Sequence, residues 1–315
     1  MRAVTFSRYG GPEILQLGER PIPTPGRGEV LLRVHAAAVN PVDWKLASGA
    51  FRLVLPQRFP VVPGMDVAGT VEAVGKGVTT LRPGDRVHGR LDGPGACAEF
   101  ALAKVDVLAP IPAGMTMAEA AALPLAGMTA LQALRDACRV PLANASQRVL
   151  VVGASGGVGH LGVQVAKAAG ATVVGVCSGR NVSFVERLGA DAVIDYTGPA
   201  PYEGQRPFDV VLDCVSDNPG AYLPLLTPRG HYAAVLPGPR VIARALLNPL
   251  GGRRAHPILL RRSGVDLRLL DGLWEQGRLR VAIDAAYPLE GLAEAWRRSI
   301  TGRAVGKIVI EVAPA

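Results

Sequence analysis

A run of small residues between two apolar segments is the first place in this sequence where chemistry is expected. Ala154, Gly156 and Gly159 follow the spacing G-x-G-x-x-G of a dinucleotide-binding turn, with alanine in the first position. A turn of this kind presents backbone N–H groups and the positive end of a helix to a phosphate. The residues expected to bind the pyrophosphate of a dinucleotide are therefore Ala154, Ser155, Gly156, Gly157, Val158 and Gly159.

The segments on either side of this turn are those that a nucleotide site needs. Residues 149–152 are apolar and mostly β-branched, which is typical of a strand buried on both faces of a parallel sheet. After the turn, apolar residues recur at the spacing of one helix face until Gly170, where we expect the helix to end. We expect a small residue at position 154 to permit the tight turn, Gly156 to admit the pyrophosphate, and Gly159 to let the helix approach the strand.

The same residues also spell a second motif, because residues 153–157 read G-A-S-G-G and so match G-x-S-x-G. That motif is the nucleophile elbow of α/β hydrolases, in which Ser155 would be the nucleophile. Its partners, in the required chain order, would be an acid, Asp209 or Asp213, and then a histidine, His231 or His256. The third glycine favours the dinucleotide site, since a hydrolase does not need it, and no H-G-G-G oxyanion segment lies upstream.

The expected second strand ends in residues that bear on the choice between NADH and NADPH. An NAD site usually has an acidic side chain about twenty residues after the glycine turn, where it binds the ribose hydroxyls. Residues 177–181 read Cys-Ser-Gly-Arg-Asn, and the first acid is Glu186, in the next helix. Ser178 and Arg180 instead suit a 2′-phosphate, because a guanidinium matches a phosphate with two hydrogen bonds. We therefore predict NADPH as the cofactor.

The composition excludes several classes of protein. With 315 residues, 49% of them hydrophobic and 19% charged, the chain is long enough for two domains and too apolar to be extensively disordered. Most of its cationic residues are arginines, and its densest basic stretch, residues 240–262, lacks the interleaved aromatics of a nucleic-acid platform. The four cysteines are far apart without a C-x-x-C pair, so neither a disulfide framework nor a zinc cluster is expected.

The sequence also bears on location and assembly. The N-terminus has no charged-then-apolar secretory pattern, and no apolar run is long enough to span a membrane. We therefore expect a cytoplasmic protein without membrane contact. Residues 257–260 have the pattern of a strand at a sheet edge, flanked by arginines. Because an unpaired apolar edge is a liability, we expect two copies to pair there as a homodimer.

The order of patterns along the chain indicates two kinds of domain. Up to about residue 115, short strand-like segments alternate with turns that contain Gly and Pro, which is typical of an all-β barrel. A capping box, Thr116-x-x-Glu119, then opens an alanine-rich helix, and a second helix is expected over residues 129–139. From residue 147 onward strands and helices alternate, which predicts an α/β fold with a Rossmann-type doubly wound parallel sheet.

Several motifs along the whole chain occur in a specific order. They are Tyr9-Gly10-Gly11-Pro12-Glu13, Asn40-Pro41-Val42-Asp43-Trp44-Lys45, Pro63-Gly64-Met65-Asp66-Val67-Ala68-Gly69, the stretch of residues 146–167, and Gly306-Lys307-Ile308-Val309. Together they resemble the zinc-free quinone-oxidoreductase branch of the medium-chain dehydrogenase/reductase superfamily. The resemblance implies a GroES-like catalytic domain over residues 1–120, completed by residues 265–315. It also implies a Rossmann NADP-binding domain over residues 121–264.

The resemblance further implies that the chain binds no metal. Zinc-dependent members hold the catalytic metal with a cysteine, a histidine and a second cysteine. The motifs put Asn40 and Met65 at the first two of these positions and Ala126 near the third. None of the three has the thiolate or imidazole that zinc prefers. The implied reaction is therefore a zinc-independent transfer of hydride from NADPH to a quinone, an enone or a related unsaturated carbonyl compound.

Roles for individual residues also follow from the resemblance. It implies Asn40 beside the nicotinamide, Thr129 at the amide end of that ring and Tyr196 beside the 2′-phosphate. The predicted cofactor-binding set is completed by Val215, Val235 and Lys307. Asn40 and Lys45 are the candidate catalytic residues, because a donor near the acceptor oxygen would stabilise the negative charge that develops there. Where several relatives have a tyrosine that could act as the acid, this chain has Phe51, so we expect the proton to come from solvent.

Two functions of other classes stay open on the sequence alone. A non-catalytic NADPH-binding protein could contact nucleic acid through the arginines of residues 240–262, and it would bind NADPH without turnover. A serine hydrolase would instead cleave esters with Ser155 and bind no cofactor.

Overall fold

Two compact units make up the part of the chain that the computed structural model describes, which is residues 1–199, 201–215 and 218–313. Unit 1 comprises Met1–Leu125, Arg262–Asp271 and Val281–Ala315, and unit 2 comprises Ala126–Arg261 and Gly272–Arg280. The chain first passes from unit 1 to unit 2 after Leu125 and returns to unit 1 after Arg261. The segment Gly272–Arg280 belongs to unit 2. The domain bounds expected from the sequence, residues 1–120 with 265–315 and residues 121–264, stay a prediction.

Unit 1 is the mainly antiparallel β domain that the sequence predicts. Its strands are β1 (Arg2–Thr5), β2 (Gln16–Glu19), β3 (Glu29–Val39), β4 (Asp66–Val74), β5 (Arg86–Arg90), β6 (Phe100–Lys104), β7 (Leu108–Pro110), β14 (Ile283–Pro288) and β15 (Lys307–Glu311). The main sheet has the order β14-β15-β3-β4-β5-β7, and β1 pairs with β2 in a separate sheet. The first half of β3 pairs with β6 and its second half with β15.

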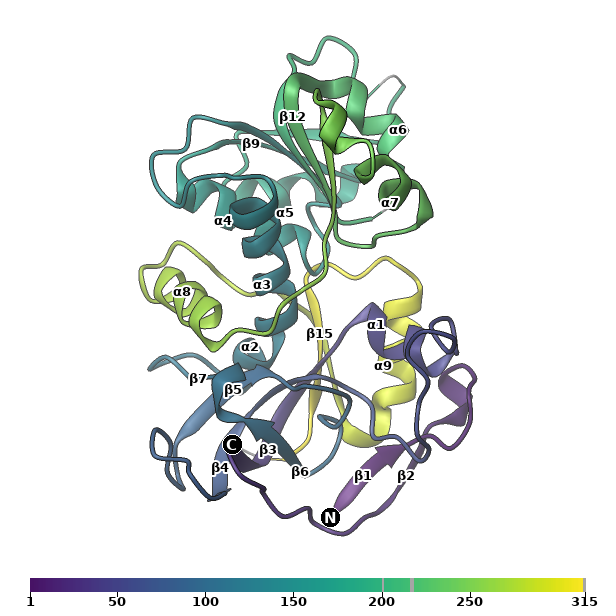
Figure 1. The fold of residues 1–315 in the computed structure, drawn as a ribbon, viewed down its shortest axis with the longest axis vertical. Helices are drawn as coiled ribbons and strands as arrows, with labels where there is room; N and C mark the ends of the chain where they lie inside the picture. Colours follow the sequence, from purple (N-terminus) through teal and green to yellow (C-terminus); the bar gives the residue numbers. More distant parts are fainter. Residues whose placement is uncertain (200, 216–217, 314–315) are drawn as a thin grey trace. The chain divides into compact units, whose positions relative to one another are not determined.

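The pairing of β3 with β15 joins the two ends of the chain in one core. Figure 1 shows the yellow C-terminal strand β15 beside the purple-blue strand β3. Leu32 of β3 and Ile310 of β15 are fully buried in the same apolar cluster, together with Trp296 of the helix α9 (Leu292–Ile300). Because Ile308 lies opposite Val39 in this pairing, the preceding residue, Lys307, is carried close to the end of β3.

Unit 2 contains the parallel sheet that the alternating strands and helices predict. Its strands are β8 (Arg148–Val152), β9 (Thr172–Cys177), β10 (Ala192–Asp195), β11 (Phe208–Asp213), β12 (Leu226–Ala234) and β13 (Arg254–Pro257). They lie in the order β10-β9-β8-β11-β12-β13, and every neighbouring pair is parallel. The carboxyl ends of these strands therefore share one edge of the sheet, which is where open α/β sheets bind their ligands.

Helices accompany the strands in both units (Figure 1). The α-helices are α1 (Pro41–Ala47), α2 (Met117–Ala122), α3 (Pro124–Gln132), α4 (Gly159–Ala169), α5 (Val182–Arg187), α6 (Pro219–Tyr222), α7 (Pro239–Ala245), α8 (Gly264–Glu275) and α9. Single 3₁₀ turns lie at η1 (Pro12–Ile14), η2 (Val105–Val107), η4 (Gly179–Asn181), η5 (Leu223–Leu225), η6 (Asn248–Leu250) and η7 (Leu289–Gly291), and η3 (Ala133–Ala137) is a π-helical turn.

Local signals in the sequence set several helix ends. Thr116 caps α2 by accepting the backbone N–H of Glu119, and the Glu119 carboxylate accepts the N–H of Thr116. Gly170 ends α4 with a left-handed backbone, φ +100°. The helix expected over residues 129–139 is wrong in its bounds: α3 begins at Pro124 and ends at Gln132, and the π-helical turn follows. A proline at the first helical position explains the earlier start.

The predicted edge strand lies at the sheet edge with different bounds. Its position at the end of the strand order is as expected, because β13 pairs only with β12 among the described strands. The strand covers Arg254–Pro257, however, so the expected span of residues 257–260 is wrong except at its first residue. None of the described helices has the length and apolar character needed to cross a membrane. The homodimer and the cytoplasmic location stay predictions.

Candidate active site

The glycine turn after β8 has the geometry that a pyrophosphate site requires. Gly153 has a left-handed backbone, φ +73°, which residues with a side chain rarely adopt. A Cβ on Gly159 would lie only 2.1 Å from the carbonyl oxygen of Gly153, so α4 approaches β8 this closely because residue 159 is glycine. Gly159 therefore has the packing role expected for it, whereas the tight turn is made by Gly153 rather than by Ala154.

Backbone groups at this turn are free to bind a phosphate. The N–H groups of Ser155, Gly157 and Val158 make no backbone hydrogen bond within the described part of the chain, and they lie at the positive, N-terminal end of α4. A Cβ on Gly156 would meet only one atom, the carbonyl oxygen of Gly153 at 3.4 Å. The protein itself therefore leaves the space above Gly156 open. Unpaired N–H groups beside open space at a helix N-terminus fit the pyrophosphate of a dinucleotide.

Other predicted cofactor residues follow the carboxyl ends of neighbouring strands in unit 2. They are Ser178 after β9, Tyr196 after β10, Val215 after β11 and Val235 after β12. Val215 reaches the glycine turn, since a Cβ on Gly153 would lie 2.3 Å from Cγ2 of Val215. The parallel order of the strands thus gathers these residues at one edge of the sheet.

The turn after β9 contains an exposed Arg180 and a neighbouring acid that sequence reasoning missed. The carboxylate of Asp195, the last residue of β10, would lie 2.5 Å from a Cβ on Gly179. It accepts hydrogen bonds from the N–H and the hydroxyl of Thr197 at 2.9 and 2.7 Å, and these hold the pKa of Asp195 below its usual range. The signal lay in the pairing of strands rather than in spacing along the chain, because Asp195 stands opposite Cys177 across β10 and β9.

The triad of the hydrolase alternative is not assembled. The hydroxyl of Ser155 accepts a hydrogen bond from Nδ2 of Asn181 at 3.0 Å, and Ser155 is not among the described residues with a positive φ. Asp213 accepts a hydrogen bond from the Tyr232 hydroxyl at 2.7 Å. The two candidate histidines bond to each other at 2.9 Å. The other candidate acid, Asp209, accepts the backbone N–H of Arg148 at 2.9 Å. None of these hydrogen bonds joins Ser155 to a histidine or a histidine to an acid, and Ser155 lacks the strained backbone of a nucleophile elbow.

In unit 1, the predicted catalytic Asn40 lies in a buried polar cluster. It precedes α1 as the N-cap residue and is 1% exposed. Its amide oxygen accepts a hydrogen bond from the Lys307 ammonium at 2.5 Å, and its amide nitrogen donates to Oδ2 of Asp66 at 2.9 Å. The structure therefore brings together two predicted site residues, Asn40 and Lys307, from opposite ends of the chain. It adds Asp66, which the sequence analysis did not assign to the site.

Asp43 completes this cluster from the first turn of α1. Its Oδ2 accepts the backbone N–H of Asn40 at 2.7 Å, whereas its Oδ1 is buried and has no partner among the described residues. Burial is the main cause that raises the pKa of Asp43 to about 7. Burial also raises the pKa of Asp66 and lowers the pKa of Lys307, although the attraction between these two opposes both shifts. The Asn40 cluster, defined as Asn40, Asp43, Asp66 and Lys307, is therefore a place where charge is strongly desolvated.

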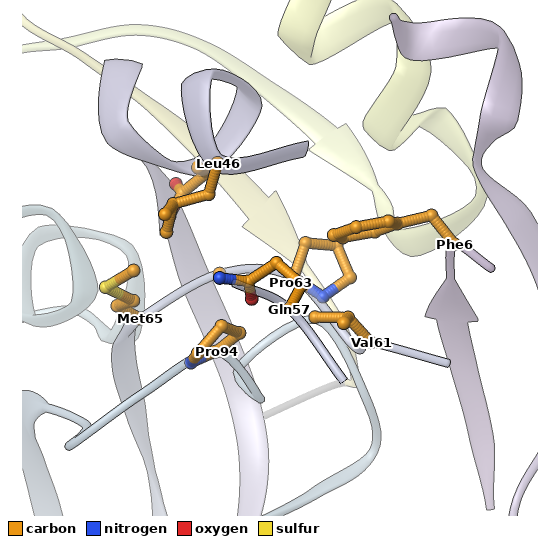
Figure 2. Close-up of a pocket in the computed structure, with 9 residues that line it drawn as sticks. Phe6, Leu46, Gln57, Val61, Pro63, Met65 and Pro94 are labelled. Carbon is orange, nitrogen blue, oxygen red and sulfur yellow. The ribbon is translucent and has the colours of Figure 1, made fainter. Parts of the chain in front are cut away.

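A small pocket of unit 1 includes Asp43 in its wall and explains why this carboxyl is poorly solvated. Most of the side chains around the pocket are apolar. Figure 2 labels Phe6, Leu46, Val61, Pro63, Met65 and Pro94, together with the polar Gln57. A carboxylate among such groups loses its hydration without regaining hydrogen bonds. The unpartnered Oδ1 of Asp43 is the atom that bears this cost.

The residues at the positions of a catalytic zinc do not fit a metal ion. Asn40 Oδ1 is bound by the Lys307 ammonium, and Sδ of Met65 accepts a hydrogen bond from the Arg90 guanidinium at 3.0 Å. Cationic groups thus contact both of these side chains, and they would repel a divalent cation. Within residues 1–199, 201–215 and 218–313, no group of three or more His, Cys, Asp and Glu side chains could hold a metal ion. The absence of a catalytic metal stays a prediction.

Two further predicted residues lie outside the Asn40 cluster. Lys45 is on α1, half-buried, with its Nζ 5.5 Å from the centre of the Trp44 ring. Thr129 is on α3 in unit 2 and is 6% exposed. Their roles toward the nicotinamide and the acceptor stay predictions.

The arginines of residues 240–262 are largely used within the fold. Arg244 and Arg253 donate hydrogen bonds to backbone carbonyl groups. Arg261 and Arg262 pair with aspartates at 2.7 and 3.1 Å. Guanidinium groups engaged in this way are less available to a nucleic-acid backbone, which weakens the nucleic-acid alternative.

Comparison with known proteins gives consistent matches over the whole chain. Residues 26–133 match the family model described as the alcohol dehydrogenase GroES-like domain, and residues 188–310 match the one described as zinc-binding dehydrogenase. The chloroplast envelope quinone oxidoreductase homolog of Arabidopsis thaliana is 38% identical, over 99% of this chain and 98% of its own length.

Solved structures give the same picture of the fold. The quinone oxidoreductase from Coxiella burnetii superposes with a TM-score of 0.90 at 31% identity, over 99% of each chain. Mycobacterial Rv1454c in complex with NADPH superposes with a TM-score of 0.86 at 31% identity, over 99% of this chain and 100% of that one. Similarity therefore extends over both units.

Proposed function

Because this chain belongs to the medium-chain dehydrogenase/reductase superfamily, in its quinone-oxidoreductase branch, we propose that it is a zinc-independent, NADPH-dependent reductase. Its acceptor is a quinone, an enone or a related unsaturated carbonyl compound. The observation that carries the proposal is the open glycine turn after β8, where the N–H groups of Ser155, Gly157 and Val158 have no backbone partner in the described chain. A turn with free N–H groups at the carboxyl edge of a parallel sheet is where dinucleotides bind in open α/β folds, and this supports the proposal.

The residues of unit 2 divide the binding of the cofactor between them. The turn N–H groups and the N-terminus of α4 take the pyrophosphate. Ser178 and Arg180 take the 2′-phosphate, because the guanidinium offers two parallel hydrogen bonds to it. The mycobacterial relative in complex with NADPH supports this choice of cofactor. When bound, the reduced nicotinamide supplies the hydride.

On the acceptor, the side chains of unit 1 have an electrostatic role. Negative charge develops on the carbonyl oxygen as the hydride arrives, and a fixed hydrogen-bond donor stabilises that charge. Asn40 is the first candidate for this donor and Lys45 the second. A donor of this kind contributes roughly 10²- to 10³-fold to the rate in other enzymes. Since Phe51 cannot donate a proton, the proton that completes the reduction comes from solvent.

The proposal is tested by titrating the purified protein with NADPH and with NADH while nucleotide fluorescence is recorded, followed by addition of an ortho-quinone and, separately, an enone. We expect tight binding of NADPH, weaker binding of NADH, and oxidation of NADPH when an acceptor is added. Pre-incubation with a zinc chelator should leave the rate unchanged, because the metal positions hold Asn40 and Met65.

Each alternative predicts a different result in the same experiment. A non-catalytic NADPH-binding protein would bind the nucleotide without oxidising it in the presence of any of these acceptors. A hydrolase would bind neither nucleotide and would cleave esters in a reaction abolished by Ser155→Ala. A rate abolished by the chelator and restored by zinc would contradict the zinc-independent mechanism.

A further inference from the structure

We propose that Lys307 and Asp66 are positioning residues that hold the Asn40 amide in one orientation, with an N–H of its nitrogen left to bind a ligand carbonyl oxygen. The inference rests on the proposed function, in which Asn40 is a site residue. It adds which end of the Asn40 amide faces the ligand and which residues hold the amide in that orientation. The evidence lies in the contacts on the two sides of the Asn40 side chain.

On one side, Lys307 determines where the amide oxygen lies. Its Nζ donates to Oδ1 of Asn40 at 2.5 Å and to the carbonyl oxygen of Val39 at 3.3 Å. An ammonium has only donors, so the atom that faces it must be an acceptor. Lys307 is 4% exposed, and the antiparallel pairing of β15 with β3, in which Ile308 stands opposite Val39, fixes its backbone. The lysine therefore has little freedom to turn toward another partner.

On the other side, Asp66 determines where the amide nitrogen lies. Its Oδ2 accepts from Nδ2 of Asn40 at 2.9 Å, and its Oδ1 accepts the backbone N–H of Leu125 at 3.1 Å. An ionised carboxylate has only acceptors. Asp66 is fully buried at the start of β4, where it pairs with Ala38 of β3. Turning the Asn40 amide over would place its oxygen against this carboxylate and its NH₂ group against the ammonium, so both contacts would become repulsive.

This orientation leaves one N–H of Asn40 weakly bound. One hydrogen of Nδ2 is used by Asp66, and the nearest acceptor given for the other is the carbonyl oxygen of Ala38 at 3.4 Å. That distance lies beyond the usual range for an N–H···O bond. Asn40 is 1% exposed, so a ligand oxygen that takes this hydrogen must enter the buried cluster, but it breaks no good hydrogen bond there. The ligand group that fits is a carbonyl oxygen, either of the nicotinamide carboxamide or of the acceptor.

The hydrogen-bond chain also makes that N–H a better donor. The ammonium polarises the amide by bonding to its oxygen, and polarised groups in a chain strengthen one another where the dielectric is low. Without Lys307 the amide could turn over and present its oxygen, which would repel a developing oxyanion. Lys307 and Asp66 thus act on the ligand only through Asn40.

The test is a double-mutant cycle in the full-length chain, with kcat and KM measured for NADPH and an ortho-quinone. Asn40→Leu is introduced into the wild type and into the Lys307→Met/Asp66→Asn double variant, which removes both charges and so leaves neither buried alone. The expected loss in kcat/KM from Asn40→Leu is roughly 10²- to 10³-fold in the wild type and under about threefold in the double variant. An equal loss in the two backgrounds would overturn the proposal.

A matched control separates positioning from general stability. His88 and Asp271 form another buried polar contact of unit 1, at 3.1 Å between β5 and α8. His88→Gln/Asp271→Asn should lower the melting temperature by about as much as Lys307→Met/Asp66→Asn does. The loss in kcat/KM caused by Asn40→Leu should nevertheless be the same in this control background as in the wild type. If the control pair removes the Asn40 effect equally well, positioning by Lys307 and Asp66 is refuted.

A readout without the cofactor keeps this inference independent of the proposed function. In protein labelled with ¹⁵N at asparagine, the side-chain N–H resonances of Asn40, assigned from Asn40→Leu, should shift in Lys307→Met/Asp66→Asn and not in the control pair. We call the hold of Lys307 and Asp66 on the Asn40 amide the clamp. Unchanged resonances would contradict the clamp even in an active enzyme. The wild type could fail to oxidise NADPH while the Asn40 resonances still shift in Lys307→Met/Asp66→Asn. That combination would refute the proposed function and leave the clamp supported.

The NADPH dissociation constant then identifies the ligand oxygen. If Lys307→Met/Asp66→Asn raises this constant with kcat unchanged, the N–H binds the nicotinamide carboxamide. If kcat falls with the constant unchanged, the N–H binds the acceptor oxygen. Either pattern supports the clamp, and a double variant that leaves both quantities unchanged refutes it.

Discussion

The substitution Asp43→Asn should make this protein less sensitive to alkaline pH, and the size of the effect follows from the burial of this carboxyl. Asp43 is 4% exposed, its Oδ1 has no partner among the described residues, and its pKa is raised from 3.8 to about 7. Asparagine keeps the oxygen that accepts the backbone N–H of Asn40 and removes the charge that burial disfavours.

The sign follows from the direction of the shift. Because the pKa is higher in the folded chain than in the unfolded chain, the folded state keeps a proton that the unfolded state has released. The favourable contribution of the protonated carboxyl is complete below pH 3.8 and is lost as the pH rises through about 7. From these two values the wild type should lose roughly 2–3 kcal/mol of stability between pH 5 and pH 8 through Asp43 alone.

Urea-induced unfolding at these two pH values measures the effect. Two of the three tryptophans, Trp44 and Trp296, belong to unit 1, so their fluorescence reports its unfolding. The stability of Asp43→Asn relative to the wild type should rise by roughly 2–3 kcal/mol from pH 5 to pH 8. Asp106→Asn, which removes an exposed carboxylate of the same unit, corrects for the change in net charge. A relative stability that is the same at both pH values, or that falls, would refute the reasoning.

Four other results are expected. Arg180→Ala should weaken NADPH binding roughly 10- to 100-fold and NADH binding by less than about threefold, because only the former loses a charge-assisted pair; equal losses in a fluorescence titration would contradict a 2′-phosphate role. Asp195→Asn, which removes a carboxylate beside Gly179, should improve NADPH binding roughly two- to fivefold over NADH in the same titration, and an unchanged ratio would count against that electrostatic effect. Gly159→Ala should destabilise the chain by about 1–3 kcal/mol in thermal unfolding, since its Cβ would meet the Gly153 carbonyl oxygen, and an unchanged melting temperature would show that α4 shifts freely. The mass measured by sedimentation at micromolar concentration should be twice that of one chain if β13 edges pair, and the mass of a single chain would exclude the dimer.

Residues near one another in the sequence were the easiest to place in advance. The apolar run of residues 149–152, the small residues after it and the helix to Gly170 form a strand, a turn and a helix as expected. The capping box at Thr116 and the left-handed Gly170 are likewise local. Hydrogen bonds within a helix and its caps join residues only a few positions apart, so residue order alone carries the information. The motifs also predicted which residues follow the carboxyl ends of the parallel strands. They further predicted that Asn40 and Met65 stand where zinc-dependent relatives have metal ligands.

Residues brought together by strand pairing could not be assigned this way. Lys307 and Asp66 contact Asn40 because β15 and β4 pair with the same strand, β3, in particular registers. Asp195 reaches the turn at Gly179 because β10 lies beside β9. A shift of one residue in any of these pairings would turn the side chain to the other face of the sheet.

The sequence by itself therefore determined the fold class, the glycine turn and the kind of cofactor site, since these depend on local spacing and on short motifs. Only the tertiary structure decided which charges surround Asn40, which end of its amide faces Lys307, and that Asp43 is buried with one oxygen that has no partner in the described chain. The physical reason is that desolvation and charge pairing depend on every neighbour in space. Those neighbours come from strands far apart in the chain, and the register of the folded sheet alone sets their positions.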